Sequence, residues 1–269
     1  MVIKRLDLIY SLFLIVNQNK TDDPDYVLAQ YFLEHYTELG KLNIYDVAAD
    51  CYVSRSTVRR FCQQLGYDNF KDVKDEFKEF EYQYTCFTKL VKKENFKEYL
   101  ATELESMVHE LNQRLNMEEL DKIVERIHDS KNVIFLSSYS SVLFLTEFQR
   151  PLVLSGKLIK IMTDTHMDIE YLENLEQDDF VVMVSATGNF ARANEELMKR
   201  IKAYKMLLTT SRKKEIELVY DKVYHLSAND YSDIKSVYSK YGMEYLFDVL
   251  YSRYLRKYGM LVEHEDKKL

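Results

Sequence analysis

The chain has 269 residues, of which 46% are hydrophobic and 30% charged, with only 6 Gly and 2 Pro. This is the composition of a globular protein, and the scarcity of chain-breaking residues predicts that long helices dominate. The formal net charge of −7 argues against a protein that coats nucleic acid over its whole surface, but it leaves room for one basic contact face.

The apolar start of the chain is predicted to form an amphipathic helix. Leu6, Ile9, Phe13 and Val16 recur at helical spacing, and the polar residues that follow lack the small-residue cleavage site of a secretory leader. No run reaches the ~20 apolar residues of a membrane span, and the three cysteines and six histidines lack metal-type spacing. We therefore expect a cytoplasmic protein with reduced thiols and with no membrane partner, metal or cofactor.

Three further helices are expected in the first part of the chain. Asp23 and Pro24 predict an N-cap followed by proline at the first helical position, and Gly40 is expected to end that helix. Two shorter helices are predicted over about residues 45–50 and 55–65. Because only a tight turn separates these two, the pair predicts a helix-turn-helix.

The packing of this helix-turn-helix follows from the spacing of its side chains. Ser54 is placed to cap the second helix by accepting a hydrogen bond from the backbone N–H of Thr57. The small residues Ala48 and Ala49 let the second helix approach the first closely. The buried stripe of the second helix is expected at positions i, i+3, i+4 and i+7. These positions are Val58, Phe61, Cys62 and Leu65.

The opposite face of the second helix has the chemistry of DNA recognition. Between Cys51 and Leu65 the chain has three arginines and no acidic residue, although it is acidic overall. Arginine offers paired donors to guanine, and serine and threonine bind phosphates, so the first turn of such a helix can meet base edges and backbone. A surface helix that happens to be basic is the competing interpretation. The candidate DNA-binding residues are Ser54, Arg55, Ser56, Thr57, Arg59 and Arg60.

A longer pattern around this helix resembles a known family. It runs Val53-Ser-x-x-Thr57-Val58-x-Arg60-Phe61-Cys62-x-x-Leu65-Gly66-Tyr67 and continues with Phe70-Lys-Asp-Val-Lys74. This gap-free pattern closely resembles the N-terminal domain of RpiR/MurR-type regulators, which binds operator DNA as part of a dimer or larger assembly. Ser54, Thr57 and Arg60 occupy places of the motif, whereas the other three candidates follow from helix geometry. The resemblance implies operator DNA as a partner and a homodimer or homotetramer.

Farther along the chain, the periodicity predicts more helix and then a sheet. A long helix is expected from about Lys93 to Asn116, and another around residues 120–127. Short apolar runs then alternate with helical stretches, which is typical of βαβ units in a parallel sheet covered on both faces. A tyrosine-rich helix follows after about Ser236, and most of its rings are expected to pack against the sheet domain or a partner subunit. The predicted strands are 132–136, 158–162, 180–184, 206–208 and 223–226.

We therefore predict two domains joined by a helix. The first is an all-α helix-turn-helix domain at residues 1–80, followed by a linker helix at 81–118. The second, at 119–269, is an α/β three-layer domain with a parallel five-stranded sheet. It resembles a SIS (sugar isomerase) domain, the usual partner of the RpiR/MurR-type N-terminal domain, over about residues 121–258. This resemblance implies that the second domain binds a phosphorylated sugar.

The loop after the third predicted strand carries the stronger sign of a ligand site. Its sequence, Ser185-Ala-Thr-Gly-Asn-Phe190, looks like the SIS phosphate loop S-x-S-G-x-T. Hydroxyls and free backbone N–H groups at a helix N-terminus suit a dianionic phosphate, and Gly188 permits close approach of the backbone. Ser185 and Thr187 match the two hydroxyl places, whereas Phe190 replaces the final threonine. The candidate ligand-binding residues here are Ser185, Thr187, Gly188 and Asn189.

The loop after the first predicted strand departs from the SIS pattern. Its sequence, Ser137-Ser138-Tyr139-Ser140-Ser141, meets the pattern G-x-G-x-S only at Ser141, because Ser137 and Tyr139 replace the glycines. Tyr139 adds bulk where a sugar ring would approach. Loop solvation and helix capping by Ser140 or Ser141 are the competing explanation for the serines. The candidate ligand-binding residues of this loop are Ser137, Ser138 and Ser141.

Three functions are compatible with these features. The first is a transcription factor that senses a phosphorylated sugar and controls carbohydrate-metabolism genes. The second is a DNA-binding protein whose degenerate second domain serves only for oligomerisation. The third is a sugar-phosphate isomerase, which needs a general base near the sugar. Glu170, Glu173 and Glu195 do not lie in a motif tied to catalysis, so we expect a regulator and not an enzyme.

Overall fold

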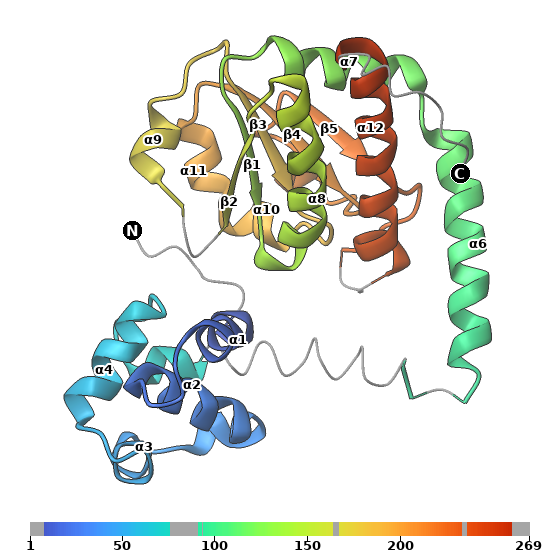
Figure 1. Cartoon of the computed structure of the whole chain (residues 1–269). Helices are drawn as coiled ribbons and strands as arrows, with labels where there is room; N and C mark the ends of the chain where they lie inside the picture. Colours follow the sequence, from blue (N-terminus) through green and yellow to red (C-terminus); the bar gives the residue numbers. More distant parts are fainter. Residues whose placement is uncertain (1–7, 76–90, 93, 164–166, 233–235, 260–269) are drawn as a thin grey trace, which may run out of the picture. The chain divides into compact units, whose positions relative to one another are not determined.

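The chain folds into two compact units, Met1–Phe96 and Lys97–Leu269 (Figure 1). The computed structural model describes residues 8–75, 91–92, 94–163, 167–232 and 236–259. Among these residues, no helix combines the length and the apolar character needed to cross a bilayer.

The N-terminal unit consists of helices. They are α1 (Leu8–Gln18), α2 (Pro24–Glu34), the 3-10 helix η1 (Tyr36–Lys41), α3 (Ile44–Asp50) and α4 (Arg55–Gln64). Asp23 caps α2 as predicted, because its carboxylate accepts a hydrogen bond from the N–H of Asp25 at 2.8 Å. Helix α2 ends at Glu34 and not at Gly40, since His35 leaves α-helical geometry (φ −98°, ψ 21°) and the chain continues as η1.

Apolar side chains from all of these helices meet in one core. The rings of Phe32 and Phe61 pack edge to face with centroids 5.6 Å apart. The predicted stripe of α4 is confirmed, because Val58, Phe61, Cys62 and Leu65 are all buried. Burial also raises the pKa of the Cys62 thiol to about 12, so this side chain acts as a packing group and not as a nucleophile.

The second unit is an α/β domain with three layers. Its strands are β1 (Val133–Ser137), β2 (Lys160–Thr163), β3 (Phe180–Val184), β4 (Tyr204–Thr209) and β5 (Lys222–His225). Its longer helices are α6 (Phe96–Arg114), α7 (Met117–Asp129), α8 (Val142–Leu152) and α12 (Met243–Tyr258). Shorter helical segments are η2 (Tyr139–Ser141), η3 (Val153–Ser155), α9 (Ile169–Glu173), α10 (Asn189–Ala193), α11 (Glu195–Arg200), η4 (Lys214–Ile216) and the π-helix η5 (Tyr238–Gly242).

The five strands form one sheet in the order β2-β1-β3-β4-β5, and every neighbouring pair is parallel. All five residues of β1 and of β3 are buried, as expected for central strands of a sheet covered on both faces. The predicted five-stranded parallel sheet is therefore confirmed: β3 has the predicted bounds, and the bounds of the other four strands differ from the prediction by one or two residues.

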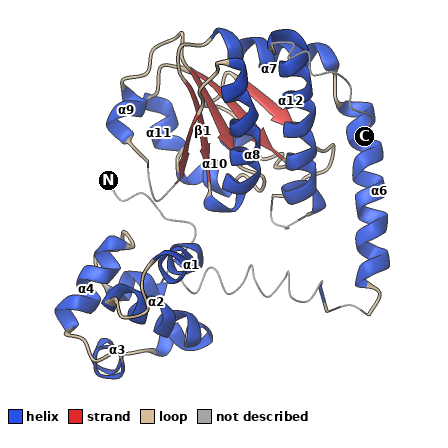
Figure 2. Ribbon diagram, in the orientation of Figure 1, coloured by secondary structure: helices blue, strands red, loops and turns tan. Residues whose placement is uncertain are grey.

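Helices cover both faces of this sheet (Figure 2). On one face, Val133 and Phe135 of β1 and Val182 of β3 belong to the core that includes α6, α7, α8 and α12. The intervening residues Ile134 and Val181 point to the opposite face and are fully buried. Helices α9, α10 and α11 lie on that side of the sheet. The result is the predicted three-layer arrangement.

Two helices that the periodicity predicted pack into the core of this unit. Helix α6 buries Met107 and Leu111 there, so it is part of the second unit. In the tyrosine-rich region, Tyr238 and Tyr254 are buried in the same core. The expectation that these rings pack against the sheet domain is confirmed for both.

Candidate functional site

Helices α3 and α4 form the helix-turn-helix, and the start of α4 has the predicted cap. Ser54 has extended backbone geometry (φ −78°, ψ 153°), and its hydroxyl accepts a hydrogen bond from the N–H of Thr57 at 3.1 Å. The same hydroxyl lies 2.6 Å from Oγ of Ser56 and 2.9 Å from Oγ1 of Thr57. The first turn of α4 therefore presents three linked hydroxyls together with the positive end of the helix dipole.

The exposed face of α4 is basic. Arg55, Ser56, Arg59 and Arg60 are exposed, Ser54 is exposed at the cap, and Thr57 is half-buried. The structure thus brings all six candidate DNA-binding residues to the first turns of one helix. Arg60 also lies close enough to Asp25 of α2 to lower the pKa of that carboxyl, although burial, the larger effect, leaves that pKa raised.

One neighbour of this face could not be found from the sequence pattern. Tyr45, at the start of α3, is 60% exposed, and the guanidinium of Arg55 lies 4.6 Å from the centroid of its ring. This cation–π contact holds the Arg55 side chain in place. Its partners lie ten positions apart, and only the turn between the helices brings them together.

In the second unit, the sheet order identifies the edge where a ligand would bind. The chain leaves β1 toward β2 on one side and β3 toward β4 on the other, so β1 and β3 flank the topological switch point. Open α/β sheets bind ligands beyond the carboxyl ends of the strands at this point. Ser137 ends β1 opposite Val184, the last residue of β3. The two predicted ligand loops therefore begin side by side.

The loop after β3 is tightly braced. The Ser185 hydroxyl is buried and accepts a hydrogen bond from the N–H of Ala191 at 3.1 Å, within α10. Gly188 has φ +81°, and a Cβ at this position would lie 2.7 Å from Cδ1 of Ile216 and 2.9 Å from Cβ of Ser211. Packing within the fold is therefore a sufficient reason for this glycine, beyond the predicted approach of a phosphate.

Of two further candidates in this loop, Asn189 has a hydrogen-bond partner for its side chain within the described part of the chain and Thr187 does not. The side-chain oxygen of Asn189 accepts a hydrogen bond from Arg192 at 2.9 Å. Thr187 is half-buried, and no residue that the structure describes hydrogen-bonds to its hydroxyl. Thr187 is thus the candidate with the most available donor.

Residues at the end of β4 support the same loop, and sequence reasoning did not find them. The carbonyl oxygen of Ala186 accepts hydrogen bonds from the N–H of Thr210 at 2.8 Å, from its hydroxyl at 2.7 Å and from the Thr209 hydroxyl at 3.1 Å. Both threonines are fully buried. The sequence signal that could have indicated them is the run of hydroxyl residues Thr209, Thr210 and Ser211 at the end of a buried strand.

The loop after β1 uses part of its hydroxyls internally. Ser137 is fully buried and donates to the carbonyl oxygen of Ser138 at 3.0 Å, and the Ser138 hydroxyl lies 3.1 Å from that of Ser140. Ser141 caps α8 by position, but its hydroxyl makes no capping hydrogen bond. Ser141 is thus the serine of this loop best placed to donate to a ligand. The side chain of Tyr139 lies outside what the structure describes.

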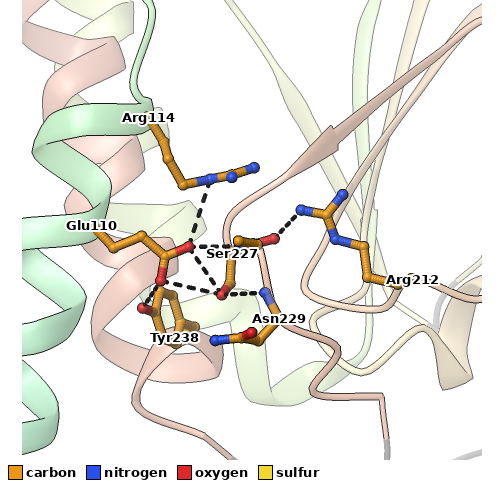
Figure 3. Close-up of polar contacts among 7 residues, drawn as sticks. Glu110, Arg114, Arg212, Ser227, Asn229 and Tyr238 are labelled. Carbon is orange, nitrogen blue, oxygen red and sulfur yellow. Dashed lines mark hydrogen bonds and ion pairs between the residues drawn. The ribbon is translucent and has the colours of Figure 1, made fainter.

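A third polar cluster joins α6 to the loops that follow β4 and β5 (Figure 3). The Glu110 carboxylate accepts hydrogen bonds from the N–H of Ala228 at 2.6 Å, from the Ser227 hydroxyl at 3.2 Å and from the Tyr238 hydroxyl. Arg212 donates to the carbonyl oxygen of Ser227. Burial raises the pKa of Glu110, but these hydrogen bonds outweigh it and hold the pKa below its usual range. The carboxylate is therefore charged at neutral pH.

Two cavities border α8. One, of about 590 Å³, lies between α8 and α12 and is lined by aromatic residues such as Phe144 and Phe247 together with Glu147 and Asp248. The other, of about 530 Å³, lies between α8 and β2. In the described part of the chain, no cluster of His, Cys, Asp and Glu is suited to hold a metal ion.

Comparison with known families decides what the N-terminal unit is. Residues 14–81 match the model of the helix-turn-helix domain of the rpiR family. The N-terminal unit is an RpiR-family helix-turn-helix domain. The match includes α2, α3 and α4 and covers the whole basic face. The predicted family resemblance is therefore confirmed for this domain.

Relatives and a solved structure extend the likeness beyond the RpiR-family domain. An uncharacterized HTH-type transcriptional regulator of Providencia stuartii is 23% identical over 63% of this chain and 62% of its own length. Another, of Clostridium perfringens, is 23% identical over 93% of this chain and 92% of its own length. The structure of the Vibrio vulnificus NanR protein complexed with ManNAc-6P is 22% identical, covers 93% of this chain and 92% of that one, and gives a TM-score of 0.50. This likeness concerns the fold.

The carboxylates weighed for catalysis lie on α9 and α11 of the second unit. Glu173 pairs with Arg200 at 2.6 Å, and Glu195 pairs with Lys199 at 2.8 Å. Glu170 is exposed on α9. Two of the three are thus engaged in surface ion pairs.

Proposed function

We propose that this protein is a cytoplasmic transcription regulator that binds operator DNA through α4 and senses a phosphorylated sugar at the switch point of its SIS-like domain. The observation that carries the proposal is the exposed basic face of α4, in an RpiR-family domain, beginning at the capped turn of Ser54. Helix-turn-helix proteins usually bind two half-sites, so the proposal includes a homodimer or homotetramer. A stable monomer with full operator affinity, seen by light scattering, would contradict that part.

Arg59→Ala is expected to weaken DNA binding. Arg59 is exposed on α4, and no residue that the structure describes pairs with it. If Arg59 contacts a phosphate, affinity falls for all sequences and the salt slope drops by about one; if it contacts a base, the loss is about 1–3 kcal/mol at one position. Fluorescence anisotropy at several salt concentrations, with a duplex that the wild type selects from a random pool, distinguishes these outcomes.

Lys20→Ala is the matched control for this experiment. It removes one exposed cation from the same domain but outside α4, so the salt slope and affinity should remain those of the wild type. Circular dichroism verifies that both variants fold. If a folded Arg59→Ala variant has the DNA affinity and the salt slope of the wild type, Arg59 does not contact DNA.

The sugar-phosphate part of the proposal is supported by the two loops at the switch point. Their available hydroxyls lie beyond adjacent strand ends, that of Ser141 at the N-terminus of α8 and that of Thr187 just before α10. Such donors can bind an anion without a buried cation. NanR, whose fold is similar, was solved with ManNAc-6P, so amino-sugar phosphates belong in the first screen. A thermal-shift screen of hexose, pentose, amino-sugar and N-acetylmuramic acid phosphates tests this part, since a ligand of the folded state raises the melting temperature.

Thr187→Val is expected to weaken binding of the best ligand by about 1–3 kcal/mol, because one donor to a charged group is lost while the shape is nearly kept. Calorimetry measures the loss, and DNA affinity without ligand should not change. Thr102→Val on α6 is the control, since this exposed hydroxyl donates only to the carbonyl oxygen of Glu98. Equal ligand affinity in the Thr187 variant would exclude its hydroxyl from the site.

The alternative is a regulator whose second unit serves only for oligomerisation. It is favoured by the loop after β1, in which Ser137 is buried and hydrogen-bonded within the loop. If no phosphosugar stabilises the wild type but one stabilises Tyr139→Gly, the site is closed by this side chain and the alternative is correct. The third possibility, an isomerase, has no support from the ion-paired Glu173 and Glu195.

A further inference from the structure

The backbone of Tyr52, in the turn of the helix-turn-helix, has a conformation that glycine normally adopts. Helix α3 ends in a Schellman motif: the N–H of Val53 bonds the carbonyl oxygen of Ala48 at 2.9 Å, and the N–H of Tyr52 bonds that of Ala49 at 3.2 Å. This motif requires a left-handed residue at the position that Tyr52 occupies, and its φ is +54°. A side chain is strained there, because its Cβ approaches the following carbonyl oxygen.

The next helix shows how the same chain makes this motif without strain. Helix α4 ends with the N–H of Tyr67 bonded to the carbonyl oxygen of Cys62 and the N–H of Gly66 bonded to that of Gln63, both at 2.9 Å. The left-handed residue there is Gly66, with φ +88°. Among the residues that the structure describes, Tyr52 is the one non-glycine with positive φ. Glycine at position 52 would therefore serve the fold better than tyrosine.

Packing does not compensate for this strain. The Tyr52 side chain is 96% exposed, so its ring contributes almost nothing to the core of the domain. A residue that strains the backbone and gains no contact in the folded chain points to a function outside it. That function must lie close to the start of α4, because only Val53 separates Tyr52 from the N-cap Ser54.

We propose that Tyr52 is a DNA-contact residue whose phenol hydroxyl donates a hydrogen bond to a backbone phosphate beside the N-terminus of α4. The inference rests on the proposed DNA-binding function. Tyrosine hydroxyls are among the groups that bind DNA phosphates. The neighbouring surface suits a polyanion, since Arg55, Arg59 and Arg60 are exposed and no acidic residue lies between Cys51 and Leu65. Tyr52 extends this surface from α4 into the turn.

Two substitutions separate the contact from the strain. Tyr52→Gly removes the hydroxyl and relieves the backbone, so we expect about tenfold weaker DNA binding together with a melting temperature about 4 °C higher for the N-terminal unit. Tyr52→Phe removes only the hydroxyl, so binding should weaken to a similar extent at an unchanged melting temperature. Affinities are measured on the full chain by anisotropy, with the duplex selected by the wild type.

The salt dependence gives a second, independent readout. A neutral hydroxyl displaces no counterion, so both Tyr52 variants should keep the wild-type salt slope, whereas Arg59→Ala should lower it. Wild-type affinity in Tyr52→Gly would overturn the inference, and wild-type affinity in Tyr52→Phe would overturn the donation to phosphate. If the folded wild type itself selects no duplex, the proposed DNA-binding function fails. If the wild type selects a duplex and a Tyr52 variant binds it with wild-type affinity, only the inference about Tyr52 fails and the proposed DNA-binding function is unaffected.

Discussion

Replacing Gly188 with alanine is expected to destabilise the second unit by about 2–4 kcal/mol, as the sum of backbone strain and overpacking. The residue has φ +81°, and its new Cβ would lie 2.7 Å from Cδ1 of Ile216 and 2.9 Å from Cβ of Ser211. The Ile216 methyl can turn away. The fully buried Ser211 is held through its own backbone, so the loop after β4 must shift. Thermal or urea unfolding, followed by circular dichroism, measures the loss.

Gly156 provides a matched control for the backbone part of this effect. Its φ of +75° is close to that of Gly188, but nothing lies within 4 Å of a Cβ at this position. Gly156→Ala should therefore cost only about 1–2 kcal/mol of strain. The difference between the two variants isolates the contacts with Ile216 and Ser211. Equal losses would show that the loop after β3 is not wedged against the loop after β4.

The helix-turn-helix could be predicted well from sequence because its determinants are local. The cap that joins Ser54 to Thr57 and the stripe from Val58 to Leu65 depend on spacings of three, four and seven residues along one helix. Each of these was placed correctly. The contact between Tyr45 and Arg55 has no such spacing, since it depends on the angle at which two helices meet.

The candidate ligand site was less predictable because its geometry depends on distant segments. The order of the strands places the loops after β1 and β3 together, and alternating strands and helices in the sequence predict such neighbours. The sequence does not reveal that Ser211 blocks the space beside Gly188 or that Thr210 braces Ala186. It also gives no sign that the Ser137 hydroxyl turns inward. These contacts depend on how closely the strand ends pack.

The Glu110 cluster leads to the second large effect: Glu110→Ala should destabilise the second unit by about 2–3 kcal/mol. The carboxylate is the common acceptor for the Ala228 N–H and for the hydroxyls of Ser227 and Tyr238, and hydrogen bonds to a charged group are worth more than neutral ones. Its side chain is 22% exposed, so water replaces part of the loss. The ion pair with Arg114, at 3.6 Å and partly exposed, adds little. Unfolding by urea measures the change.

Glu110→Gln is the matched variant and reveals the pH dependence of the cluster. The amide oxygen can still accept from Ala228, and the amide nitrogen can donate to the Tyr238 oxygen, so this variant should lose less than Glu110→Ala. The pKa of Glu110 is held below its usual range. The carboxylate therefore contributes fully above about pH 4.3, the ordinary value for glutamate, and its contribution is lost as the pH falls through the folded pKa. The stability advantage of wild type over Glu110→Gln should be constant near neutrality and shrink in acid. A constant advantage throughout the acid range would mean that the hydrogen bonds to Glu110 do not depend on its charge.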